Sequence, residues 1–311
     1  MKEEVPSILI SDGWITDENE ALVEVVIPST VETYQAPTKI TFKGDSFTWL
    51  PVDTTKLVEF VFEGTTLVFG TENLLANTTA LTTFSAPNCT NISTMDAASG
   101  NFLSSPFSNS GVSQIYLPNL ETYSHPVRRP MNARGLFATC PGITTLNLPK
   151  LKAVILSGRN GVSGRSSSNV GLCHNCANLS SISFPFLETI DNQDGGALFY
   201  SCSALTTLTL PSLKTLSGGG PLLEYCGGIQ SVSLPVIQTL TTVECGAFRN
   251  LTSLTSVQLG SEGNPISSIP SSTFSGCTQS GLTITIYTTG GASLSGSPWG
   301  ATNATIVYES A

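Results

Sequence analysis

The chain has 311 residues, of which only 11% are charged, and its formal net charge is −9. An acidic and weakly charged chain argues against general nucleic-acid binding and against a polybasic membrane anchor. No apolar run approaches the roughly 18–20 residues that a membrane span needs, and residues 1–10 lack the basic and apolar regions of an export signal.

The N-terminal part of the chain is irregular. Residues 1–21 are expected to form an N-terminal cap. Two irregular repeats are expected within residues 22–80, the first beginning at Leu22 and the second at Leu57. The stretch around Phe42, between these two repeats, is interpreted as a link.

A twelve-residue frame repeats through residues 81–281. Apolar residues hold the first, fourth, sixth, ninth and twelfth places, proline the seventh, and small polar residues most of the rest. Self-similarity in a fixed frame predicts a solenoid of stacked repeats. Regular copies begin at Leu81, Val112, Ile143, Leu179, Leu205 and Ile229, and a stretched copy begins at Leu254. Residues 282–311 are expected to supply the last strand and a C-terminal cap.

The first six residues of each copy alternate between apolar and polar side chains, as a half-buried strand does. Proline in the seventh place ends the strand because it has no N–H to donate. We therefore expect one parallel strand in each coil, a coil being one turn of the solenoid, with Leu146, Ile182, Leu208 and Val232 pointing into one core. The outward third and fifth places carry small polar groups and one aromatic ring, Tyr116.

Cysteines mark the ends of most coils. Cys140, Cys176, Cys202 and Cys226 each stand three residues before the next copy, in the contexts LFATC, LCHNC, LFYSC and LLEYC. These runs, followed by Leu-x-x-Leu-x-Leu-Pro, resemble leucine-rich repeats of the bacterial BspA type over roughly residues 20–311. The resemblance implies a repeat solenoid of strand and loop with short helical turns, capped at both ends.

The sequence offers little catalytic or metal-binding chemistry. Eight cysteines could form four disulfides, but four equivalent places in successive coils favour a column of buried thiols. Cys173 and Cys176 have a C-x-x-C spacing without the second pair that a structural zinc site normally needs. His125 and His174 have no nucleophile at an interpretable spacing, so we expect neither enzymatic activity nor a cofactor.

The connections after Ile92, Tyr123 and Val154 are longer than the others, and insertions at one place of the frame emerge from one side of a solenoid. Five of the six arginines fall in two of these loops, where they would suit carboxylate, sulfate or phosphate groups; a solvated loop face is the alternative. The predicted partner-binding residues are Arg128, Arg129, Arg134, Arg159 and Arg165 in the loops and Tyr116 on the strands.

The tenth place of the frame alternates in charge. It reads Glu121, Lys152, Glu188, Lys214 and Gln238 in successive coils. Opposite charges on neighbouring strands predict an electrostatic ladder with a structural role.

The resemblance implies a non-enzymatic bacterial protein that binds or adheres to a protein or surface glycan. It would act at the cell surface or be secreted if a leader precedes this sequence. The alternative is a structural or receptor-binding component of a phage or prophage particle, or a cytoplasmic protein, which fits the low charge and the missing export signal. The flat polar strand places suit protein contact better than an aromatic-lined glycan groove.

Overall fold

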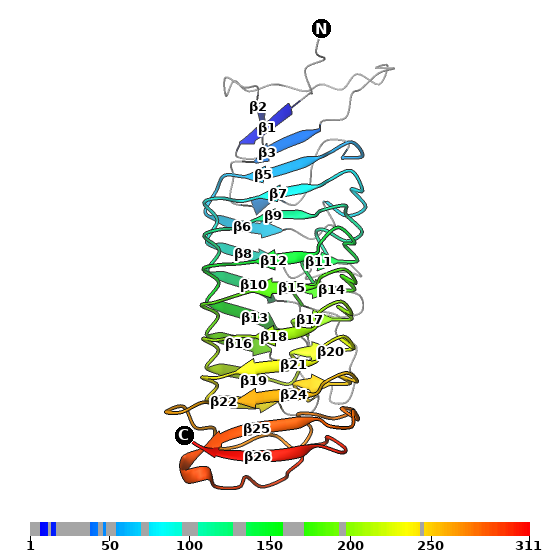
Figure 1. Ribbon diagram of the computed structural model, residues 1–311. Helices are drawn as coiled ribbons and strands as arrows, with labels where there is room; N and C mark the ends of the chain where they lie inside the picture. The colour runs from blue at the N-terminus through cyan, green and yellow to red at the C-terminus, as the bar shows by residue number, and fades with distance from the viewer. Residues whose placement is uncertain are drawn as a thin grey trace.

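The structure of the chain is a computed structural model that describes residues 7–11, 14–16, 38–42, 46–47, 54–69, 75–94, 105–126, 135–157, 171–192, 197–242 and 246–311. The coils stack along one axis from the N-terminal to the C-terminal end (Figure 1). Among the described residues, helix is confined to the 3-10 turn η1 (Thr289–Gly291), and no helix there has the length and hydropathy of a membrane crossing. The predicted repeat solenoid is confirmed.

The first strand of each coil lies at the third to fifth places of the sequence frame. These strands pair in parallel and form three sheets that follow one another along the stack. They are β3 (Lys39–Phe42), β5 (Glu59–Phe62), β7 (Thr83–Ser85), β9 (Gln114–Tyr116), β12 (Thr145–Asn147), β15 (Ser181–Ser183), β18 (Thr207–Thr209), β21 (Ser231–Leu234), β24 (Ser256–Leu259), β25 (Thr283–Thr288) and β26 (Thr305–Ser310). We call the outward side of these strands the strand face.

Two further sets of strands complete the coils. The second strands form one eight-stranded sheet, made of β4 (Ser46–Phe47), β6 (Thr66–Phe69), β8 (Asn91–Thr94), β10 (Thr122–Pro126), β13 (Ala153–Ser157), β16 (Thr189–Asn192), β19 (Thr215–Gly218) and β22 (Thr239–Thr242). The third strands are β11 (Phe137–Ala138), β14 (Cys173–His174), β17 (Phe199–Tyr200), β20 (Leu223–Glu224) and β23 (Phe248–Arg249).

Two expected details are therefore corrected. Regular coils carry up to three parallel strands where the sequence indicated one, because the backbone between corners is extended and pairs with the next coil wherever it runs straight. In β16, for example, Ile190 and Asn192 are buried and alternate with more exposed residues. The LFATC, LCHNC, LFYSC and LLEYC runs hold two-residue strands in place of the expected short helical turns.

The register of the first strands follows the sequence frame. Leu146 pairs with Ile182, and Leu208 pairs with Val232, so the fourth places of neighbouring copies lie side by side. Leu146, Leu208 and Val232 are buried, and Ile182 is partly buried against the same core. The predicted inward residues are confirmed.

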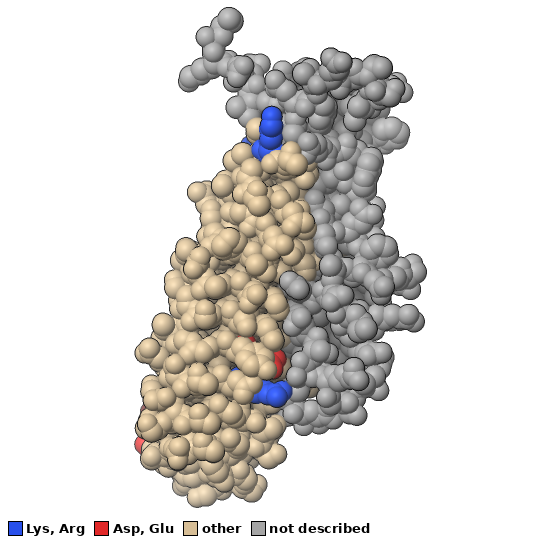
Figure 2. All heavy atoms as spheres, turned by 90° about the vertical axis from the view of Figure 1, so that its right-hand side faces the viewer, with Lys and Arg blue, Asp and Glu red and all other residues tan. Residues whose placement is uncertain are grey.

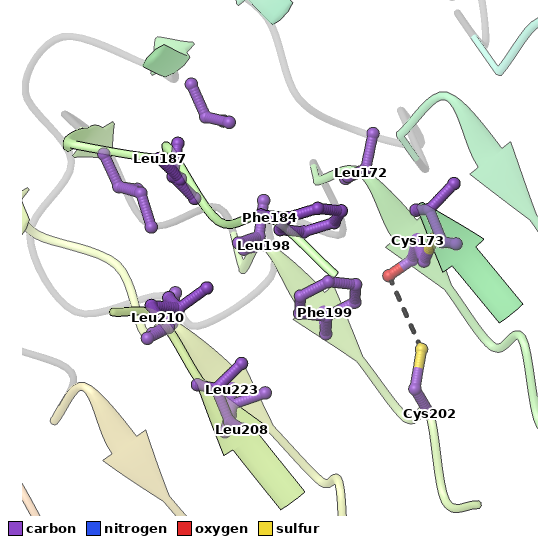
Figure 3. Close-up of a cluster of buried hydrophobic side chains, with 14 of the residues drawn as sticks. Leu172, Cys173, Phe184, Leu187, Leu198, Phe199, Cys202, Leu208, Leu210 and Leu223 are labelled. Carbon is purple, nitrogen blue, oxygen red and sulfur yellow. Dashed lines mark hydrogen bonds between the residues drawn. The ribbon is translucent and has the colours of Figure 1, made fainter. Parts of the chain in front are cut away.

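Leucine, phenylalanine and cysteine side chains from all three sets of strands meet inside the coils. Figure 3 shows Phe184, Phe199, Leu208 and Leu223 converging on one interior, where all four are buried. The rings of Phe184 and Phe199 stack with their centroids 6.1 Å apart. Burying one such side chain stabilises the fold by about 1.5–3 kcal/mol, so the continuous apolar column is what holds the coils together.

Hydroxyl groups at the corners bind the backbone of the preceding coil. Thr255 Oγ1 donates to the carbonyl of Gln230 at 3.1 Å, and Ser212 Oγ donates to the carbonyl of Pro185 at 2.7 Å. Each such bond contributes about 0.5–1.5 kcal/mol. Corner hydroxyl groups of this kind therefore help to join successive coils.

In each of seven successive coils, one residue adopts the left-handed backbone conformation at the corner that leads to the next first strand. These residues are Asn77, Asn109, Thr139, Asn175, Ser201, Tyr225 and Asn250, with φ between 52° and 60°. Asparagine tolerates this region better than most residues, whereas β-branched and bulky residues rarely adopt it. We call this set the corner column; Thr139 and Tyr225 are its unusual members.

The ends of the stack differ from its middle. β1 (Ser7–Ser11) pairs antiparallel with β2 (Trp14–Thr16) and parallel with β3. At the other end, Trp299 is fully buried and its Nε1–H donates to the carbonyl of Ser295 at 2.9 Å. These elements lie within residues 1–21 and 282–311, whose role as caps stays a prediction.

The sequence analysis failed to predict one coil. The stretch interpreted as a link contains β3 and β4, and Ile40 and Phe42 pair with Phe60 and Phe62 of the next coil. The signal was present, because the order apolar-x-apolar-x-Gly occurs at both places, as ITFKG and FVFEG. The repeat expected at Leu22 lies outside the described residues.

Candidate functional site

The strand face carries small polar side chains along the middle of the stack. The predicted outward residues are half-buried or exposed, as expected: Thr83, Ser85, Gln114, Tyr116, Thr145, Asn147, Ser181, Ser183, Thr207, Thr209, Ser231 and Ser233. Tyr116 is 57% exposed and is the one large ring in this set. Hydroxyl and amide groups on rigid, paired strands can both donate and accept hydrogen bonds, so the strand face suits contact with another polar surface.

The predicted charge ladder lies at the corner beside the strand face. Lys152 Nζ lies 3.0 Å from Glu121 Oε2, and Lys214 Nζ lies 3.2 Å from Glu188 Oε2. The backbones of these pairs are joined as well. The N–H of Lys152 donates to the carbonyl of Glu121 at 2.8 Å, and the N–H of Lys214 donates to the carbonyl of Glu188 at 2.9 Å. The ladder is confirmed as part of the stacking. Beside it, Phe186 is 58% exposed.

The five predicted arginines, Arg128, Arg129, Arg134, Arg159 and Arg165, all lie outside the described residues. The strands that lead to the three long connections are described. β8, β10 and β13 are consecutive neighbours in the second-strand sheet, paired in parallel with their C-terminal ends together. The three connections therefore start from adjacent points on one edge of the sheet, while their grouping in space stays a prediction.

A buried polar cluster lies at these strand ends. Nδ1 of His125 is 2.6 Å from Oγ1 of Thr94 and 3.3 Å from the hydroxyl of Tyr123, which donates to the carbonyl of Gly171 at 3.0 Å. His125 and Tyr123 are fully buried. Burial lowers the pKa of His125 to about 3 and raises that of Tyr123 well above its ordinary value. The sequence did not reveal this cluster, because its members are brought together only when the coils stack.

The thiols form the predicted column. Cys140, Cys176, Cys202 and Cys226 are buried and free, as are the other described cysteines, Cys89, Cys173 and Cys277. Cys140 Sγ donates to the carbonyl of Phe107 at 2.8 Å, and Cys202 Sγ lies 3.9 Å from the carbonyl of Cys173 (Figure 3). Burial, helped by neighbouring thiols, raises the pKa of Cys173 well above its ordinary value. These cysteines act as small apolar residues that also bond to the preceding coil.

The third strands carry a row of ring and charged side chains that the sequence did not single out. His174, Tyr200, Glu224 and Arg249 are register partners in four successive coils. The rings of His174 and Tyr200 stack at 4.6 Å with an interplanar angle of 4°, and Tyr200 meets Tyr225 edge to face at 5.4 Å. Arg249 Nη1 lies 3.8 Å from Glu224 Oε1.

The environments within this row differ. Glu224 is 3% exposed, and burial raises the pKa of its carboxyl while Arg249 opposes the rise. Tyr225 is 47% exposed. Figure 2 turns the side of β14, β17 and β20 toward the viewer, and charged side chains are sparse on the described surface there. The aromatic residue one or two places before Cys202 and Cys226 was the sequence signal for this row.

Comparisons with known proteins identify the repeat type. Six copies of the BspA type leucine rich repeat region match residues 169–290, which contain the coils from β14 to β25. A leucine-rich repeat protein from Eubacterium ventriosum ATCC 27560 matches with 16% identity over 80% of this chain and 75% of that chain, with a TM-score of 0.26. One from Bacteroides ovatus ATCC 8483 matches with 17% identity over 84% and 77%, with a TM-score of 0.27. No curated protein matches.

Proposed function

The chain is a leucine-rich repeat protein of the bacterial BspA type, and we propose that it works as a non-enzymatic protein-binding module at a bacterial surface. The observation that carries the proposal is the strand face, on which small hydrogen-bonding groups recur at two places in successive coils. Eleven first strands at about 4.8 Å spacing give a face about 48 Å long. That length suits an interface of ordinary size, about 800 Å² on each partner.

Rigidity supports the same role. The outward side chains stand on strands whose inward neighbours are buried and whose backbones pair with the adjacent coils. A rigid surface loses little conformational entropy when a partner binds. Tyr116, the exposed ring among small polar groups, is proposed as an anchor, since tyrosine is enriched among the residues that dominate binding energy.

Arg128, Arg129, Arg134, Arg159 and Arg165 are proposed as a second contact, for carboxylate, sulfate or phosphate groups of the partner. The support is their concentration in connections that start from adjacent strand ends. A variant with Arg128, Arg129 and Arg159 replaced by alanine should bind more weakly and with a shallower dependence on salt. Unchanged affinity and salt dependence would remove this contact from the proposal.

The test is a binding screen of the purified protein against host matrix proteins, anionic glycans and bacterial cell envelopes, at low and physiological salt. Saturable binding to a protein, with at least a fivefold loss in Tyr116→Ala, is the expected result. Thr189→Ala, an exposed residue of the second-strand sheet, is the matched control and should bind normally. Absence of binding across the panel would contradict the proposal.

A further inference from the structure

The structure places two tyrosine rings, a buried carboxylate and a guanidinium in one contiguous row on the third strands. Tyr200 and Glu224 are paired in register, and Tyr225 follows Glu224 directly. Tyr225 meets Tyr200 edge to face at 5.4 Å, and the stacked ring of His174 supports Tyr200 from the preceding coil. Two tyrosine rings, Tyr200 stacked on His174 and Tyr225 partly exposed, thus lie beside the carboxylate of Glu224.

Tyr225 is held in an unfavourable backbone conformation. Its φ is 54°, in the left-handed region that bulky residues rarely adopt. The equivalent corner positions are asparagine at Asn175 and Asn250 and serine at Ser201. A large ring therefore replaces a small residue in the corner column at a conformational cost, and strain of this kind clusters at binding sites.

Tyr225 also protrudes from its surroundings. It is 47% exposed, and its neighbours in the corner column, Ser201 and Asn250, have short side chains. Its ring meets the ring of Tyr200 edge to face, with an interplanar angle of 68°. An exposed aromatic surface of this size gives a partner side chain room to stack.

The charge beside the rings selects the partner chemistry. The Glu224 side chain is only 4% exposed, and Nη1 of Arg249, its ion-pair partner among the described residues, lies 3.8 Å from Oε1, beyond hydrogen-bond distance. Arg249 belongs to the following coil, whereas Tyr200 belongs to the preceding one. Tyr200 and Arg249 therefore lie on opposite sides of Glu224 along the stack. The whole chain also has a net charge of −9. Aromatic faces attract cations, so both features favour a positively charged group.

We propose that Tyr200 and Tyr225, with Glu224 beside them, bind a lysine or arginine side chain of a protein partner. This inference rests on the proposed protein-binding function and adds a site outside the strand face. A cation over an aromatic ring contributes little at exposed sites and more when it is partly desolvated. The neighbouring carboxylate adds attraction that weakens with salt.

The experiment measures binding of a synthetic peptide with three lysines, and of the same peptide with every lysine acetylated on Nε. The substitution Tyr225→Asn restores the residue type of Asn175 and Asn250 and keeps the net charge, so general attraction to the acidic chain is unchanged. We expect at least a fivefold loss of affinity in Tyr225→Asn and with the acetylated peptide. Tyr225→Phe, which keeps the ring, should bind within twofold of the parent protein.

Folding is controlled within the same series. Tyr225→Asn should have a melting temperature equal to or above that of the parent protein, because asparagine tolerates the left-handed conformation. Lost binding in a fully folded variant would then belong to the site. Glu224→Gln should weaken binding and flatten its salt dependence.

Lysine-peptide affinity within twofold of the parent in Tyr225→Asn would overturn the inference, and so would equal binding of the acetylated peptide. Selective binding of a neutral sugar at Tyr225, without lysine binding, would also overturn it. The peptide assay needs no natural partner, so its failure leaves the strand-face proposal standing. Failure of the protein screen with an intact peptide response would remove the proposed function and leave a cation site without its partner.

Discussion

Nδ1 of His125 lies 2.6 Å from Oγ1 of Thr94, and the two side chains hold the same place in neighbouring coils. Both are fully buried at the end of the second strands. Burial lowers the pKa of His125 to about 3, well below the 6.5 of an ordinary histidine. The folded chain therefore keeps this imidazole neutral through mildly acidic conditions.

His125 should make the fold acid-sensitive. Between about pH 6.5 and 3 the unfolded chain binds a proton that the folded chain excludes, so the free energy of unfolding falls as the pH falls through this window. When the unfolded chain binds one full proton more than the folded chain, the free energy of unfolding falls by about 1.4 kcal/mol per pH unit. His125 alone should therefore lower the free energy of unfolding by about 1.5 kcal/mol between pH 6.5 and 5. Urea denaturation at several pH values measures this, and the non-titrating His125→Gln should lose correspondingly less. Parallel pH profiles for the two proteins would contradict the assignment.

Two adjacent glycines should respond differently to alanine. A Cβ on Gly228 would stand 2.1 Å from the carbonyl oxygen of Ser203 in the preceding coil, whereas a Cβ on Gly227 would meet only Thr252 Oγ1 at 3.6 Å. Gly228→Ala must push two coils apart, so we expect a loss of about 3 kcal/mol. Gly227→Ala should change stability by less than about 0.5 kcal/mol. Chemical denaturation compares them directly, and equal effects would mean that the coils are spaced less tightly than described.

The ion-pair ladder should contribute modestly and depend on salt. Lys214 and Glu188 are about half exposed, so their coupling should be about 0.2–1 kcal/mol. A double-mutant cycle with Glu188→Gln and Lys214→Gln isolates that coupling. The coupling should vanish in 1 M NaCl, where charges are screened over about 3 Å. A larger, salt-independent coupling would indicate that the pair does more than set stacking.

The thiols should be unreactive in the folded protein. The seven cysteines among the described residues are buried, so a reagent in solution cannot reach their sulfur atoms while the chain is folded. Burial also raises the pKa of Cys277 to about 11, which leaves almost no thiolate on that residue at neutral pH. A thiol-specific reagent such as DTNB should leave these seven groups unlabelled in the native state and label all eight cysteines in urea. Labelling of Cys140 or Cys176 in the native protein, identified by mass spectrometry, would contradict the packing of the column.

The repeat frame could be predicted from the sequence because each of its places has the same structural role in every coil. Apolar places such as Leu208 face the core, and hydroxyl places such as Thr255 bond to the preceding coil. The second and third strands of each coil were harder to predict. Two-residue strands such as Phe199–Tyr200 are too short to show an alternation of apolar and polar residues. The coil containing Ile40 was missed because its spacing departs from the regular frame.

Of the candidate sites, one was predicted from the sequence and one was found only in the structure. Tyr116 was predicted from strand alternation and is exposed as expected, while its role stays a proposal. The row of His174, Tyr200 and Tyr225 depends on contacts between residues about 25 positions apart in the sequence, which only the length of each coil brings into register. The unusual backbone of Tyr225 has no sequence signature apart from a tyrosine where other coils carry asparagine, serine or threonine.

The most direct measurement concerns the strand face itself. Ser181→Arg with Thr207→Arg places two large side chains on exposed positions of β15 and β18, and Thr189→Arg with Thr239→Arg places the same charge on exposed positions of β16 and β22. Binding of both double variants to a protein identified in the screen would be measured by titration calorimetry. A loss of at least tenfold on the strand face, with affinity retained in the second-strand variant, is the predicted result. Full affinity in the strand-face variant would contradict the account.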